Sequence, residues 1–161
     1  MSRPYIVARV RQMAEFEYST IIACEASKLF EFIIRPHQAY TLSPPKMNIT
    51  LLQTPEIIEL GSVIRFQVEA FGMTQEFTHE IIAFEPDQRF VEQQTKGLFK
   101  KYVHEHSVTP TEGGVKLRDR VEFQPPGGMV GMMLTEDRIR ENLKKSLEYS
   151  HGELKKTMES A

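Results

Sequence analysis

The sequence has few of the residues that stabilise small domains through disulfide bonds or bound metal ions. It contains one cysteine, Cys24, and no tryptophan. A single thiol cannot close a disulfide within the chain, and no group of cysteines and histidines has zinc-finger spacing. Because disulfide-rich folds belong to oxidising compartments, the composition favours a reducing compartment, and we expect a cytoplasmic protein.

The sequence also lacks an excess of charge of one sign and a long apolar run. Twenty basic and 22 acidic residues give a formal net charge of -2. The chain therefore lacks the excess of positive charge that would attract nucleic acid or an anionic membrane. The first 15 residues carry three arginines but no apolar stretch of the length that a secretion signal needs. No later run approaches membrane-spanning length. We therefore expect a soluble protein with neither a nucleic-acid partner nor an integral membrane segment.

What the chain has is enough apolar material for one core. It is 161 residues long and 40% of its residues are apolar, which is typical of one domain. No internal repeat or linker divides it. We expect residues 1–161 to form a single domain.

The first third of the chain predicts a strand followed by two short helices. Phe16–Ala23 is rich in β-branched and aromatic residues, as strands are. Apolar residues then recur at helical spacing from Ala26 to Ile34, and Pro36 limits that helix. Residues 37–43 are expected to add a helical turn or two, and residues 47–52 to be extended.

Most of the remainder, up to Pro125, reads as strands separated by turn residues. Alternation of apolar and polar side chains predicts strands over 64–70 and 73–83, with Gly72 in the turn between them, followed by strands over 89–96, 102–109 and 115–124. Gly113 and Gly114 supply the positive φ of a tight hairpin between the last two. If Pro110 lies opposite Val115, His106 lies opposite Asp119 and His104 opposite Val121.

After the Pro125–Gly128 segment the apolar period changes to that of a helix. Residues 139, 143, 147, 154 and 158 form one apolar stripe, which predicts a long amphipathic helix from about Gly131 to Met158. A strand, two short helices, a run of antiparallel strands and a long helix make an α+β domain. A strongly curved sheet around that helix leaves space between them.

Four segments of the chain together resemble one family. They are Cys24–Ile33, with its Leu29-Phe30 helix opening; Leu42-Ser43-Pro44-Pro45; Arg89–Gln94 followed by Gly97-Leu98-Phe99 and Tyr102-x-His104-x-His106; and Gly113–Gly127. The combination is similar to the SRPBCC superfamily, and in particular to its bacterial cyclase/dehydrase members. That superfamily includes START lipid-binding domains, the birch-pollen allergen fold and aromatic polyketide cyclases. The sequence departs from the pattern at Glu25, Leu98 and Tyr102, where proline, proline and tryptophan are usual.

The resemblance implies a helix-grip fold, in which a curved antiparallel sheet wraps around the long C-terminal helix. It also implies an internal cavity for a largely apolar small molecule, such as a lipid or a polyketide, held by a carrier or sensor. Some members of the superfamily catalyse cyclisation or dehydration, so an enzyme remains open on fold alone.

Strand parity gathers several polar side chains on inward faces that are otherwise apolar. Tyr102, His104 and His106 share one face of their strand, Asp119 lies on the facing row of the next, and His79 is placed between Phe77 and Ile81. Such groups pair with one another or with buried water in any fold, because unpaired buried polar groups are costly. They are also suited to form the polar end of a ligand pocket. The predicted ligand-binding residues are Phe66, Phe77, His79, Tyr102, His104, His106, Asp119, Val121 and Met133.

Two further interpretations of these residues concern chemistry. His106 oriented by Asp119 has the arrangement of a general base, with Tyr102 polarising a carbonyl, as in a cyclase or dehydratase. His104 and His106, with His79 or Asp119, also have alternate-residue spacing that suits zinc. Because paired histidines are common without either role, we expect ligand binding, with no metal and no cofactor.

Overall fold

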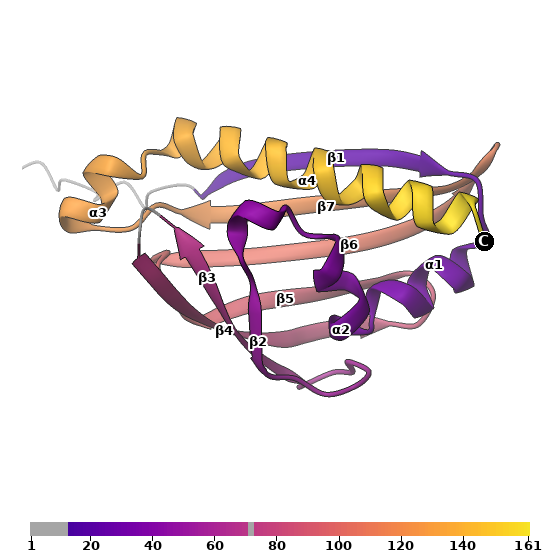
Figure 1. Ribbon diagram of the computed structural model, residues 1–161, viewed down its shortest axis with the longest axis horizontal. Helices are drawn as coiled ribbons and strands as arrows, with labels where there is room; N and C mark the ends of the chain where they lie inside the picture. Colours follow the sequence, from indigo (N-terminus) through magenta and orange to yellow (C-terminus); the bar gives the residue numbers. More distant parts are fainter. Residues whose placement is uncertain (1–12, 71–72) are drawn as a thin grey trace, which may run out of the picture.

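A seven-stranded antiparallel sheet forms one layer of the molecule in residues 13–70 and 73–161, the part that the computed structural model describes. Its strands follow the order β1-β7-β6-β5-β4-β3-β2, so the first strand lies beside the last (Figure 1). The strands are β1 (Ala14–Ile22), β2 (Thr50–Gln53), β3 (Val63–Ala70), β4 (Met73–Glu85), β5 (Arg89–Lys96), β6 (Lys101–Thr111) and β7 (Gly114–Gln124).

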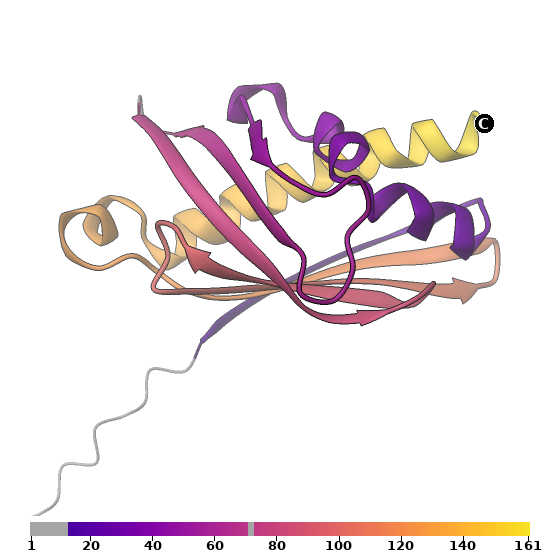
Figure 2. The same ribbon diagram turned by 90° about the horizontal axis from the view of Figure 1, so that it is seen from below.

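The helices form a second layer on one side of this sheet (Figure 2). The long helix α4 runs alongside β1 (Figure 1). The helical segments are α1 (Ala26–Ile33), α2 (Pro36–Ala39), the 3₁₀ turns η1 (Tyr40–Leu42) and η2 (Pro45–Met47), α3 (Gly128–Met133) and α4 (Glu136–Glu159).

The hairpin between β6 and β7 has the predicted register. Pro110 pairs with Val115, His106 with Asp119 and His104 with Val121. Gly113, in the turn, and Gly114, at the start of β7, have φ of 86° and 139°, values that suit residues without a Cβ atom. Register is therefore fixed by this turn together with the alternation of buried and exposed residues along β7.

The inner face of the sheet carries the core, and the outer face carries charge. Ile22, Leu117 and Leu154 are buried in a large cluster that joins β1, β7 and α4. On the outer face, Arg118 pairs with Glu17 at 2.7 Å and Arg89 with Glu105 at 2.8 Å. Strand β4 changes register between Thr78 and His79 and again between Ile81 and Ala83. Such irregularities bend a strand and let the sheet curve around the helix.

The predicted helix from about Gly131 is wrong at its start. A separate helix α3 ends at Met133, Leu134 leaves helical geometry, and Thr135 begins α4 by accepting a hydrogen bond from the Arg138 amide. Threonine in this N-cap role satisfies a backbone donor that the first turn leaves free. The chain breaks here although its composition permits helix, because the buried Leu134 is drawn into a small core cluster with Val121 and Phe123.

The other predicted elements are confirmed, with shifts at their ends. The first strand is two residues earlier than predicted, and the extended segment predicted from Met47 begins at Thr50, after a 3₁₀ turn that includes Met47. The strand at 89–96 has the predicted bounds. The turn predicted at Gly72 lies outside the described residues. The helix-grip architecture of the α+β domain, with short helices after the first strand, is confirmed.

None of the helices in residues 13–70 and 73–161 has both the length and the apolar character needed to cross a membrane.

Candidate functional site

A cavity of about 400 Å³ lies between the inner face of the sheet and the helices. Its wall is mostly apolar and comes from α1, α2, β3, β4 and α4, with Ile64, Phe66, Val68, Phe77 and Leu143 among its residues. Ligand pockets in proteins typically enclose a few hundred cubic ångströms and combine apolar walls with few polar groups. Six histidine and carboxylate residues of this wall gather on adjacent strands β4 to β7 and on α4 and form a polar cluster; they are His79, Glu92, His104, His106, Asp119 and His151. The other polar residues of the wall are Tyr40, Ser43, Tyr102, Asn142, Ser146 and Ser150.

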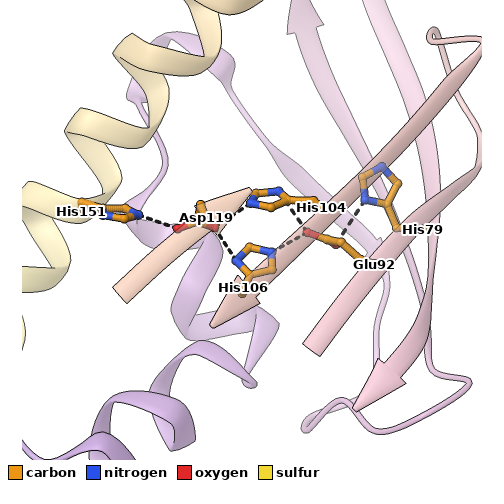
Figure 3. Close-up of polar contacts among 6 residues, drawn as sticks. All are labelled: His79, Glu92, His104, His106, Asp119 and His151. Atoms are coloured by element: carbon orange, nitrogen blue, oxygen red, sulfur yellow. Dashed lines mark hydrogen bonds and ion pairs between the residues drawn. The ribbon is translucent and has the colours of Figure 1, made fainter. Parts of the chain in front are cut away.

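Asp119 is the centre of the polar cluster and is 3% exposed. Its Oδ1 atom lies 2.6 Å from both His104 Nε2 and His106 Nδ1, and its Oδ2 atom lies 2.5 Å from His151 Nε2 (Figure 3). Burial alone would raise the pKa of this carboxyl, but the positive charge of His106 and hydrogen bonds from three imidazoles hold it well below its usual range. Asp119 is therefore a buried carboxylate with three imidazole donors.

Glu92 forms a second centre, one strand away on β5. Its Oε1 lies 2.9 Å from His106 Nε2 and 3.6 Å from His104 Nδ1, and its Oε2 lies 3.2 Å from His79 Nδ1 (Figure 3). Burial opposes its ionisation, yet hydrogen bonds from His106 and His79 hold the pKa of Glu92 well below its usual range. His106 therefore links two buried carboxylates.

The two histidines on β6 differ in protonation although their rings stack with centroids 3.8 Å apart. Both nitrogens of His106 face carboxylate oxygens, and a nitrogen must carry hydrogen to donate to one. Burial would lower the pKa of His106, but the charge of Asp119 and hydrogen bonds to both carboxylates raise it to about 10. For His104, burial and the neighbouring charge of His106 lower the pKa. His106 is the imidazolium of the pair, and His104 is the neutral ring.

Two tyrosines lie beside this cluster in the cavity wall. Burial, followed by the negative charge of Glu92, raises the pKa of both Tyr40 and Tyr102. Both therefore keep their phenolic hydrogen at neutral pH and are potential hydrogen-bond donors.

The structure brings most of the predicted site residues to the cavity. Seven of the nine line it: Phe66, Phe77, His79, Tyr102, His104, His106 and Asp119. Val121 and Met133 do not. Val121 is fully buried in a cluster with Phe123, Leu134 and Ile139, and Met133 is 58% exposed because the chain turns away at the end of α3. These seven remain predicted binding residues.

Sequence reasoning missed Glu92 and His151, which complete the cluster. A signal for each was present. Glu92 is two residues from the buried Phe90 on β5, so strand parity places it inward, opposite His104. His151 is four residues after Leu147 and three before Leu154, so it lies on the apolar stripe of α4. A polar residue on an apolar stripe needs a buried partner, and Asp119 is that partner.

Three residues of the cluster also have the donor atoms of a metal site. Glu92, His104 and His106 each offer a ligand atom, and these atoms lie within 4.8 Å of one another. The zinc interpretation of the sequence, which was not the one expected, named His79 or Asp119 as a further ligand. In the structure, Glu92 is the carboxylate that faces His104 Nδ1 and His106 Nε2, the ring nitrogens directed away from Asp119.

The family of the chain follows from comparison with known proteins. The family described as "Polyketide cyclase / dehydrase and lipid transport" matches residues 13–159. The chain belongs to this family. The match covers nearly the whole described part, including every residue of the polar cluster. No curated protein matches the chain.

Solved structures of low sequence identity share the fold of this family member. Protein CV1439 from Chromobacterium violaceum is 14% identical, with a TM-score of 0.71 over 90% of this chain and 96% of that one. Ginseng major latex-like protein 151 from Panax ginseng is 16% identical, with a TM-score of 0.69 over 91% of this chain and 98% of that one. The di-domain ARO/CYC StfQ of the steffimycin biosynthetic pathway is 14% identical, with a TM-score of 0.68 over 92% of this chain and 52% of that one.

Proposed function

We propose that the protein binds a largely apolar small molecule, such as a lipid or a polyketide, in the cavity between the sheet and α4. The observation that carries this proposal is the cavity itself, about 400 Å³ in volume with a mainly apolar wall. Family membership supports it, because the family combines lipid transport with polyketide chemistry.

The composition of the wall favours an aromatic, largely apolar ligand with a polar group at one end. Phe66 and Phe77 stack with ring centroids 5.4 Å apart and leave their remaining surface to the cavity. Next to them, His79 packs edge-on against Phe66, so the apolar wall passes directly into the polar cluster. Aromatic walls suit flat ligands, and a few fixed polar groups orient them.

Retention and displacement of ligand provide the test. Native mass spectrometry of gently purified protein should show a bound small molecule, and a fluorescent lipid probe should bind and be displaced by the extracted molecule. A tryptophan in the cavity should abolish probe binding, and Val68→Trp places one there because Val68 lines the wall. In a cavity of this size the added ring costs less than the roughly 1–3 kcal/mol of overpacking in a filled core.

Gln67→Trp is the matched control, because Gln67 neighbours Val68 on β3 and its side chain points to the opposite face. It should leave probe binding unchanged. The binding proposal fails if the wild-type protein neither retains nor takes up any apolar molecule, or if the two tryptophan variants bind the probe equally well.

A cyclase or dehydratase is the second candidate, and the placement of His106 and Tyr102 in an apolar cavity favours it. Asp119 lies behind His106 as an orienting carboxylate would, at 2.6 Å from Nδ1. Glu92 occupies the Nε2 atom that a general base would use, so His106, which the two carboxylates keep protonated, must first lose a proton to act as a base. His106→Ala and Asp119→Asn should abolish turnover of a polyketide substrate while the fold is kept. Turnover that survives both changes would remove these residues from the mechanism.

A further inference from the structure

His104 Nδ1 and His106 Nε2, the ring nitrogens directed away from Asp119, both face the carboxylate of Glu92 in the cavity wall. Glu92 Oε1 is 2.9 Å from His106 Nε2 and 3.6 Å from His104 Nδ1. A tetrahedral ion with ligand bonds of about 2.0 Å holds its ligand atoms about 3.3 Å apart. The two observed distances lie on either side of that spacing, so side-chain shifts of a few tenths of an ångström bring these pairs to it.

The opposite edges of the same side chains are already held. One oxygen of Asp119, Oδ1, accepts from Nε2 of His104 and from Nδ1 of His106, each at 2.6 Å. The second oxygen of Glu92 accepts from His79 Nδ1 at 3.2 Å. In metal sites, imidazole ligands regularly donate their far N–H to a carboxylate, and ligating carboxylates are hydrogen-bonded in turn. His151 holds the other oxygen of Asp119 and completes this outer layer (Figure 3).

Burial and charge also suit a cation. Glu92 and Asp119 are 8% and 3% exposed and are the two carboxylates of the cluster. A divalent ion between Glu92 and the two rings balances both negative charges, and each ring is then neutral, with one nitrogen on the ion and the other donating to Asp119. The ion replaces only the contacts between Glu92 and the two rings, and the other hydrogen bonds of the cluster keep their partners.

We propose that Glu92, His104 and His106 bind a divalent transition-metal ion of the zinc and iron class. Two imidazole nitrogens and one carboxylate oxygen are ligands for such ions and not for magnesium or calcium, which prefer oxygen alone. Because all three residues line the cavity, the remaining coordination positions open towards it. This proposal departs from the expectation of no metal and goes beyond the binding of an apolar molecule.

The site comes from two neighbouring strands whose pairing fixes it. His104 and His106 lie two residues apart on β6, so both rings point inward, and Glu92 pairs directly with His104 across β5 and β6. Ligands on paired strands of a buried sheet face are rigidly placed, which keeps the cost of assembling the site low.

Metal titration of the full chain tests the proposal without any organic ligand, so its result is independent of whether the cavity binds an apolar molecule. Protein freed of metal by a chelator is titrated with Zn²⁺ in competition with a chromophoric chelator. We expect one equivalent bound per chain, and no competition from Mg²⁺. With Cu²⁺ as probe, electron paramagnetic resonance should show hyperfine coupling to two imidazole nitrogens.

Substitutions of the proposed ligands test where the ion binds. Glu92→Gln, His104→Ala and His106→Ala should each weaken Zn²⁺ binding by more than about 100-fold, and Asp119→Asn, which acts through the rings, by about 10–100-fold. His37→Ala is the control for adventitious binding, because His37 is exposed on α2, and it should bind as the wild-type chain does. Circular dichroism checks that each variant is folded.

Three results would overturn the proposal. The first is a wild-type chain that takes up less than one equivalent of Zn²⁺. The second is folded Glu92→Gln and His106→Ala proteins that bind as tightly as wild type. The third is a Cu²⁺ spectrum without two nitrogen ligands, which decides the matter on the wild-type chain alone if the variants do not fold.

Discussion

Removing the Asp119 carboxylate is expected to be among the most costly single changes in the cluster. In Asp119→Ala, three buried imidazole N–H groups, on His104, His106 and His151, lose their acceptor. A buried donor left without a partner costs about 1–3 kcal/mol, and breaking a buried ion pair by removing one partner costs about 3–5 kcal/mol. Because Glu92 still holds His106, we expect a loss of about 3–5 kcal/mol in the free energy of unfolding.

Urea unfolding followed by circular dichroism measures this loss, and thermal unfolding should show a fall in Tm of roughly 10 °C at about 2–4 °C per kcal/mol. Glu122→Ala is the matched control, because Glu122 lies on the same strand and its side chain points to the outer face, where it pairs with Arg120. An exposed pair of this kind contributes less than about 1 kcal/mol. If Asp119→Ala costs no more than Glu122→Ala, the three imidazoles do not depend on Asp119 as their hydrogen-bond acceptor.

Three further changes test the backbone, each by urea unfolding. Gly152→Ala should stabilise the protein by about 0.5–1 kcal/mol, because Gly152 lies inside α4 and a Cβ atom there meets nothing within 4 Å; a loss of stability would contradict this. Thr135→Ala should cost about 1 kcal/mol by removing the N-cap of α4, and Thr135→Ser should restore it. Gly114→Ala should cost about 2 kcal/mol or more, because its Cβ atom would lie 2.1 Å from the Ile22 carbonyl oxygen; Gly113→Ala, with open space around it, should cost less.

The β6–β7 hairpin was predictable because its determinants are local. Two glycines set the turn, alternation sets the buried face, and these together place His106 opposite Asp119. The local sequence of the hairpin does not show which residues of other strands and helices pack against it. Glu92 arrives from β5 and His151 from α4, and only the packed sheet and helix bring both within hydrogen-bond distance of the hairpin.

The role of His106 was less predictable than its position. Facing Asp119 alone, it has the arrangement of an oriented base with one free nitrogen. Glu92 occupies that second nitrogen at 2.9 Å, which makes the ring a shared donor between two carboxylates. Similarly, the apolar period predicts helix across Leu134, yet burial of that side chain beside Phe123 interrupts the helix. In both cases a contact between distant segments overrides the local pattern.

The pairing of the first strand with the last has a consequence for how the chain is made. Each residue of β1 pairs with a residue of β7 about 100 positions later, from Ala14 with Phe123 to Ile22 with Val115. At a synthesis rate of about 5–20 residues per second, β1 leaves the ribosome roughly 5–20 seconds before its partner exists. During that interval β3 to β6 can form their consecutive hairpins, while the edge that β1 will join is still missing. Nascent β1 is therefore without its strand partner until nearly the whole sheet has been synthesised.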